Sequence, residues 1–469
     1  MRRTMNIAAD IRQRLLRNGG ILAYSRVALM FGQILTVPLL ATRWGSGGYG
    51  EWLSLTAIAS YISYSGIGLA PAARSDMTME YVRGGVAGIR PAFQTAMLLI
   101  GSLSIITGSV FLSANALAPF AKNLNFHYIT SGGSTAIVYA ITLQIVLNLV
   151  NAVLFAAISA TGRYSMTNAI EAARQTVEFV VLAIVVGIFK FPPTYAAWLY
   201  PTSAAIACGA AIISLQRFAP GLLTARWQPH LDVLRRLWRP MFGAFILNFG
   251  FNGLMVQAPR VVLAVVVGPT AVAAYAVAAM LLRLARIPME IPSVSMLIEL
   301  SLAYARGDMR LVRRMLQMST RITFWISIVA APILIIFGPD VVRVWSNGRL
   351  HVNRELIVIL CTSTFAYSIS VSSVVALEAI NRVAAASVVF TVLSIPFVVS
   401  CWFLSRALGI IGAGLAVASL EIAFAVFVVV SASRIFGVDK QALAAYIAPP
   451  NIRLIRDRAV QFVRRQKLL

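Results

Sequence analysis

The stretch Tyr81-Val82-Arg83-Gly84 returns 223 residues later as Tyr304-Ala305-Arg306-Gly307. Each copy is followed at the same spacing by an arginine and a glutamine, which are Arg90 and Gln94 in the first copy and Arg313 and Gln317 in the second. Similarity at a fixed offset marks an internal repeat. In a membrane protein, such a repeat is typical of two related helix bundles that flank a transport pathway. The stretch therefore favours a two-lobed transporter, provided that the chain lies in a membrane.

The composition indicates that the chain lies in a membrane. Hydrophobic residues make up 59% of the chain and charged residues 12%, whereas soluble domains have roughly 45–50% and 25%. The net charge is +24, which in a soluble protein would suggest nucleic-acid binding. Here the basic residues lie between apolar runs, so we expect no nucleic-acid partner. The three cysteines show no metal-ligand spacing, and we expect no metal site and no cofactor.

Apolar runs of transmembrane length recur along the whole chain. We predict about 12 spans, at 20–42, 49–71, 91–113, 134–158, 168–189, 194–215, 240–267, 271–300, 320–338, 354–377, 386–405 and 409–432. Pro192-Pro193 separates the fifth span from the sixth, because a proline pair cannot continue a helix. The loops between spans alternate between many basic residues and few, and the positive-inside rule then places both termini in the cytoplasm.

This pattern predicts an all-α integral membrane protein of two six-helix lobes. The expected parts are an amphipathic N-terminus at 1–19, an N-lobe at 20–216, a basic linker at 217–239, a C-lobe at 240–432 and a basic tail at 433–469. Both terminal segments have apolar residues at helical spacing among basic ones, as in helices that lie on an anionic membrane surface. A solvated basic tail remains the alternative.

The offset of 223 also pairs Gly45 with Gly268 and Asp76 with Glu299. A family resemblance rests on the stretch Arg43-Trp44-Gly45-Ser46-Gly47-Gly48-Tyr49-Gly50-Glu51-Trp52, running on to Tyr61 and Gly66-Ile67-Gly68-Leu69. In the second half it rests on Gly268, Tyr275 and Tyr304-Ala305-Arg306-Gly307-Asp308. Over roughly residues 15–435, the chain resembles the polysaccharide transporters, the Wzx-type oligosaccharide flippases of the multidrug/oligosaccharidyl-lipid/polysaccharide exporter (MOP) superfamily. The resemblance implies two six-helix lobes around a central cavity. It also implies flipping of a polyprenyl-pyrophosphate-linked glycan across the bacterial inner membrane, alongside other polysaccharide assembly proteins.

Ionisable residues inside the predicted spans are candidates for function, because charge in a membrane is costly. The cationic ones are Arg26, Arg260, Arg283 and Arg286, with Glu290 on the same helical face as the last two. Guanidinium groups bind phosphate oxygens in a bidentate manner, which suits a pyrophosphate. The alternatives are snorkelling of Arg26 to the interface and a structural ion pair between Arg286 and Glu290.

Two further sets of residues have competing interpretations. Asp76, Arg83, Glu299 and Arg306 are candidates for a cytoplasmic gate between the lobes, although Arg83 and Arg306 also suit plain positive-inside anchoring. Glu178 and Glu421 are weak candidates for proton coupling. Glu171, Arg174 and Glu178 lie at helical spacing, which favours an internal ion-pair set over a coupling site.

Two rival functions remain. A cation-coupled drug exporter of the same superfamily would need acidic residues within the first-lobe helices, whereas the charge inside these spans is mainly basic. A membrane glycosyltransferase or polymerase would need acidic residues on large outer loops, but the predicted outer loops are short and their acids are Glu51, Asp340 and Glu355. The absence of a phosphate loop or a nucleophile triad also argues against an enzyme.

Overall fold

The computed structural model is built from helices, and no strand occurs in the part of the chain that it describes. The described residues are 35–61, 63, 66, 68–118, 120, 126–224, 227–228, 230–296, 300, 303–304, 306–380 and 382–438. Within them, eight helices are long and apolar enough to cross a membrane. The predicted all-α membrane fold is therefore confirmed.

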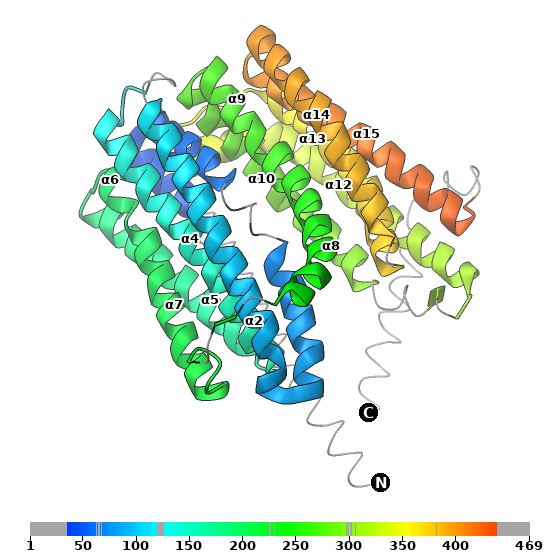
Figure 1. The fold of residues 1–469 in the computed structure, drawn as a ribbon. Helices are drawn as coiled ribbons and strands as arrows, with labels where there is room; N and C mark the ends of the chain where they lie inside the picture. Colours follow the sequence, from blue (N-terminus) through cyan, green and yellow to red (C-terminus); the bar gives the residue numbers. More distant parts are fainter. Residues whose placement is uncertain are drawn as a thin grey trace, which may run out of the picture. The chain divides into compact units, whose positions relative to one another are not determined.

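The first half of the chain begins with a helical segment at 35–61. It continues with α2 (Leu69–Leu117), α4 (Ser131–Ala160), α5 (Tyr164–Leu182), the π-helix η1 (Ala183–Ile188), α6 (Pro193–Ala196) and α7 (Leu199–Phe218). Helix α4 packs between α2 and α7, and α5 packs against α7 (Figure 1). As predicted, the chain breaks at Pro192-Pro193, and Pro193 takes the first turn of α6, where a missing N–H costs nothing.

The second half contains α8 (Leu231–Asn248), the π-helix η2 (Phe249–Gln257) and α9 (Ala258–Val266), which follow one another without a gap. The remaining helices are α10 (Pro269–Ser295), α12 (Met309–Trp345), α13 (Arg354–Ala379), α14 (Val383–Leu408) and α15 (Ile410–Phe436). Buried apolar side chains from α12, α13 and α15 form a common core that includes Leu316, Ala376 and Phe436.

The described residues divide into two compact units. The first contains those of Met1–Val277, Val341–Val352 and Val398–Ala413, and the second contains those of Ala278–Asp340, Asn353–Phe397 and Gly414–Leu469. The lobe boundary that the sequence suggests at 217–239 stays a prediction.

Glycines in the left-handed conformation lie at the repeated sites, Gly45 within the helical segment 35–61 and Gly268 after α9. Gly45 has φ +72° and Gly268 has φ +114°, a region that favours glycine because it has no Cβ. At the second repeated site Gly307 has φ +72°, whereas in the first copy the positive φ (+59°) falls on Gly85, one residue after the repeat partner Gly84. Residues 76–90, predicted as a loop, are instead helical on both sides of Gly85, so two helices meet there at a single residue.

The glycine-rich stretch at 43–52 is packed from several sides. Arg43 donates a hydrogen bond to the carbonyl of Gly187, 2.5 Å away, and a Cβ on Gly50 would lie 1.8 Å from the carbonyl oxygen of Pro269. Glu51 is fully buried and accepts hydrogen bonds from the backbone N–H groups of residues 127 to 129. Glu51 is therefore not the outer-loop acid that the sequence suggested, because the chain around it folds as a helix.

Candidate functional site

A buried ion pair joins α10 to α15 in the second compact unit. The Arg286 guanidinium meets the Glu421 carboxylate in a two-pronged contact, with Nη1 2.7 Å from Oε1 and Nη2 2.8 Å from Oε2. The side chains are 15% and 7% exposed. Both lie within helices that are long and apolar enough to cross a membrane, so the contact neutralises two charges where hydration is scarce.

Helix α13 surrounds this pair with hydroxyl groups. Ser363 accepts a hydrogen bond from Arg286 Nη2 at 2.7 Å and donates one to Glu421. Thr364 accepts from Arg286 Nε at 3.4 Å. The ring of Tyr367 lies 4.8 Å from the guanidinium carbon of Arg286, within the range of a cation–π contact. Each polar atom of the pair thus meets a polar or aromatic partner, as a buried charge requires.

Glu290 extends the cluster along α10. Its carboxylate accepts a hydrogen bond from the Tyr367 hydroxyl at 3.0 Å. The sequence offered Glu290 as the ion-pair partner of Arg286, but the ion pair that forms is the one with Glu421, 135 residues away. Tyr367 contacts both Glu290 and Arg286 and so links the two ends of the cluster.

The remaining candidate arginines have separate surroundings. Arg283 lies one helical turn before Arg286 on α10 and is exposed. Arg260 is half-buried in α9 and donates to the side chain of Gln257 at 3.3 Å. Arg26 lies outside the described residues. Of the predicted substrate-binding residues, Arg286 and Glu290 share one cluster, with Arg283 adjacent along the helix.

A serine network that joins α10, α12 and α13 was missed by the sequence analysis. Ser293 of α10, Ser319 of α12 and Ser372 of α13 lie within 3.2 Å of one another and are buried. Ser368 forms a second set with Thr323 and Ser327. Serines are common in apolar helices, where they usually bond their own backbone, so the sequence carries no signal that separates these from the rest.

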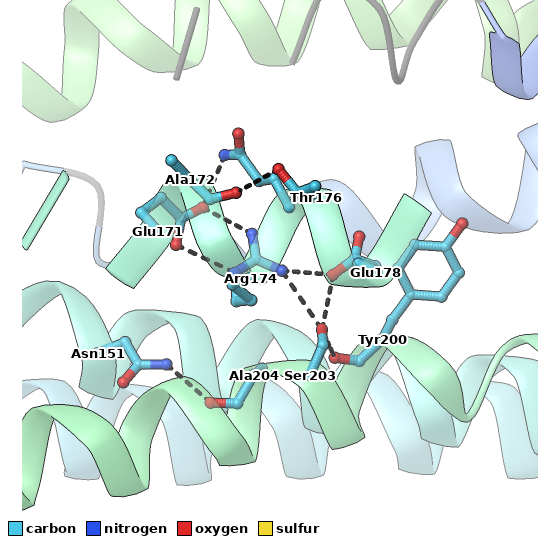
Figure 2. A network of polar contacts seen from close by, with 10 residues as sticks. Asn151, Glu171, Ala172, Arg174, Thr176, Glu178, Tyr200, Ser203 and Ala204 are labelled. Atoms are coloured by element: carbon cyan, nitrogen blue, oxygen red, sulfur yellow. Dashed lines mark hydrogen bonds and ion pairs between the residues drawn. The ribbon is translucent and has the colours of Figure 1, made fainter. Parts of the chain in front are cut away.

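The first compact unit holds its own partly buried charge cluster on α5 (Figure 2). Arg174 lies between Glu171 and Glu178, with N–O distances of 2.7 and 2.5 Å. Ser203 of α7 donates a hydrogen bond to Glu178 at 2.6 Å. The three-residue set that the spacing suggested is therefore present, and Glu178 belongs to it.

Two of the predicted gate residues, Asp76 and Arg83, lie in the N-terminal part of α2. Asp76 is buried and pairs with Arg236 of α8, with 2.6 Å between the closest atoms. Arg83 is exposed and pairs with Glu80 at 3.0 Å. Arg306 is also exposed, and Glu299 lies outside the described residues. Arg236 is a partner that the sequence analysis did not identify.

The second arginine of each repeat copy has a structural position in its own unit. A Cβ added to Gly221 would lie 4.0 Å from Arg90, and one added to Gly437 would lie 3.5 Å from Arg313. Both glycines have positive φ. Gly221 follows α7 and Gly437 follows α15, the helices of the last predicted span in each half. Cations are favourable near helix C-termini, so these arginines stabilise equivalent helix ends.

Among the described residues, no group of three or more histidine, cysteine or acidic side chains could hold a metal ion. Neither a protein-family model nor a curated protein matches the chain. Several solved structures do match. A multidrug resistance MATE family transporter of the MOP superfamily, in an inward-facing conformation, is 13% identical with a TM-score of 0.68, and the match covers 87% of this chain and 98% of that one.

The lipid II flippase MurJ, in an inward closed conformation, is 10% identical with a TM-score of 0.69, and 92% of this chain and 90% of that one are covered. A MOP-superfamily transporter from Pyrococcus furiosus, whose binding pocket is described as having reverse polarity, is 13% identical with a TM-score of 0.53 over 90% and 96% of the two chains. The chain thus has the fold of MOP-superfamily transporters and is a multi-pass membrane protein. At these identities the likeness extends to the fold alone.

Proposed function

We propose that this chain is a flippase that exports a polyprenyl-pyrophosphate-linked oligosaccharide across the bacterial inner membrane by alternating access. It then serves the assembly of a surface polysaccharide and works as a carrier, not as an enzyme. The proposal is supported by the fold that the chain shares with drug exporters and a lipid II flippase. It is also supported by the charges that α10 carries into an apolar region.

The observation that carries the proposal is the arginine pair on α10. Arg283 is exposed although it lies in a helix of transmembrane length, and Arg286 lies one turn further on. A charge in such a position is expensive and is kept for a function. Two guanidinium groups on one helical face match the several oxygens of a pyrophosphate, which they can bind in a bidentate manner. We assign Arg260 and Arg26 to the same substrate-binding role.

A cation-coupled drug exporter is the second candidate. It is favoured by Glu178 and Glu421, two carboxylates that are largely removed from solvent. In the second unit Glu421 is matched by Arg286. In the first unit Arg174 serves both Glu171 and Glu178, which leaves a formal excess of one negative charge. We prefer the anionic substrate because α10 carries an exposed arginine within a helix of transmembrane length.

The orientation follows from the charge distribution of the loops, with both termini in the cytoplasm. In this orientation Asp76, Arg83, Glu299 and Arg306 form the cytoplasmic gate, and Arg236 holds Asp76 within the first compact unit. Release of Asp76 from Arg236 would free it for another partner in a second state of the transporter.

The experiment is a Gln substitution at Arg283 in a strain whose surface glycan depends on this protein. Because Arg283 is exposed, Arg283→Gln leaves the fold intact, and we expect export to fall at least tenfold, a factor that corresponds to about 1.4 kcal/mol. Arg406→Gln, at an exposed position in the last turn of α14, is the matched control and keeps export normal. Unchanged export by Arg283→Gln at equal protein level would refute the role of this arginine.

A further inference from the structure

Glu421 occupies the position that an anionic ligand of Arg286 would take. Its two oxygens each accept from a different guanidinium nitrogen, at 2.7 and 2.8 Å, which is also how a phosphate binds to arginine. The other titratable groups near the pair are Glu290 of α10 and Cys361 and Tyr367 of α13. The α14 side chain that contacts α15 here is apolar: the ring centroid of Phe390 lies 4.8 Å from that of Phe424.

A buried ion pair of this kind is rarely kept for stability. Removing two charges from water costs several kcal/mol per ion, and apolar residues of the same volume are often as stable or more stable. The two partners also differ in chemistry. The guanidinium stays protonated under all physiological conditions, whereas a carboxylate can take up a proton. Only Glu421 can therefore change the net charge of the pair.

We propose that Glu421 is a resident counterion that Arg286 exchanges for the phosphate of the substrate, and that Glu421 takes up one proton in the exchange. This inference rests on the proposed function, since it assumes an anionic substrate. No covalent bond changes. The carboxylate leaves the guanidinium, accepts a proton from a buffer acid in the solvent, which is left as its conjugate base, and becomes a neutral carboxylic acid. Ser363, which now donates to Glu421, can accept from the acid instead, because a hydroxyl does both.

The exchange keeps Arg286 paired with one negative charge at each stage, from Glu421 or from one phosphate of the substrate. Without substrate, the positive charge of Arg286 is balanced by Glu421. With substrate, the phosphate balances Arg286 and the protonated Glu421 carries no charge. An empty carrier can then change conformation without an unpaired charge in the membrane, where such a charge is costly. Because linkage is reciprocal, anion binding raises proton occupancy and a lower pH strengthens anion binding.

The test uses the full-length protein in lipid nanodiscs, with inorganic pyrophosphate as the probe. Glu421→Gln has the shape of the protonated acid and should bind pyrophosphate about tenfold more tightly, within the 5–150-fold range typical of coupled sites. Calorimetry in buffers of different ionisation enthalpy measures proton uptake. Pyrophosphate itself titrates near neutral pH and contributes equally to both proteins, so we expect the wild type to take up about one proton more per pyrophosphate bound than Glu421→Gln. Equal proton uptake by the two proteins, or no binding at all, would overturn the inference.

Three further variants separate this site from other effects. Glu171→Gln is the matched control, because Arg174 keeps Glu178 as a second counterion, and it should leave proton uptake unchanged. The double variant Arg286→Met/Glu421→Met replaces the pair by apolar side chains and measures pyrophosphate held elsewhere on this basic chain. Ser363→Ala keeps both charges but removes their shared hydroxyl, so it should tighten binding and retain proton uptake even if Glu421→Gln fails to fold.

The outcomes also separate the inference from the function on which it rests. If cells export the glycan but the wild type takes up no more protons than Glu421→Gln on binding pyrophosphate, the counterion exchange is wrong and the flippase proposal stands. If proton-linked binding occurs but loss of the protein leaves the surface glycan unchanged, the flippase proposal is wrong. The cluster would then serve another anionic substrate.

Discussion

Glu51 illustrates how a buried carboxylate can resemble a transport residue and yet act through the fold. The carboxylate is fully buried and accepts from three consecutive backbone N–H groups, with distances of 2.6, 3.0 and 2.6 Å for residues 127, 128 and 129. Glu51→Ala leaves these donors without their acceptor, at about 1–3 kcal/mol for each buried group. Since two of the three are only partly buried, we expect a total loss of about 3–5 kcal/mol.

Chemical unfolding of the purified protein in mixed micelles measures this loss. Glu51→Gln keeps one acceptor oxygen but turns an amide NH₂ group toward the backbone donors, so it should lose about 1.5–3 kcal/mol, the value of a hydrogen bond to a charged group. The control is Glu355→Gln, at an exposed position in the first turn of α13, which should lose less than about 1 kcal/mol. If Glu51→Gln is as stable as the wild type but exports no glycan, Glu51 acts in transport and the structural account is wrong.

Two further predictions concern packing and the gate. Gly50→Ala places a Cβ 1.8 Å from a backbone oxygen of Pro269, whereas Gly47→Ala meets a side chain at 1.9 Å that can rotate away. Thermal unfolding should therefore show a loss of about 1–3 kcal/mol or more for Gly50→Ala and a smaller one for Gly47→Ala, and equal losses would contradict this. Asp76→Asn removes the charge that holds Arg236, so labelling of a cysteine placed near Asp76 should become faster in membrane vesicles. An unchanged rate would show that this ion pair does not limit access there.

The architecture was predictable from the sequence because a membrane restricts the choice of backbone structure. A chain in lipid must satisfy its own backbone hydrogen bonds, so apolar runs of sufficient length become helices. The proline pair at 192–193 and the glycines at 45 and 268 interrupt the regular helix, because proline lacks an N–H group and glycine adopts positive φ. Both residue types can be recognised directly in the sequence. The turn at Gly85 was misjudged as a loop, because nothing local shows that one glycine suffices to join two helices.

The candidate site was predictable only in part. The spacing of Arg283, Arg286 and Glu290 places them along one face of α10, and helical periodicity is enough to infer that. The partner of Arg286 could not be predicted, because Glu421 lies 135 residues away in the sequence and meets Arg286 only through the packing of α10, α13 and α15. Local spacing favoured Glu290 because it lies four residues from Arg286, whereas the tertiary structure supplied a carboxylate from α15.

The internal repeat helps to separate scaffold from function. Arg90 and Arg313 are repeat partners, and each lies near the left-handed glycine that follows the helix of the last predicted span in its half. The charged residues of the two ion-pair clusters have no charged counterpart in the other copy of the repeat. At the same offset, Arg286 and Glu421 correspond to Ser63 and Trp198, and Arg174 corresponds to Phe397. A feature needed by the fold of either half should occur in both copies, as the arginines near the helix ends do. A charge cluster that occurs in one copy only is not required by that fold, and this favours its assignment to the substrate.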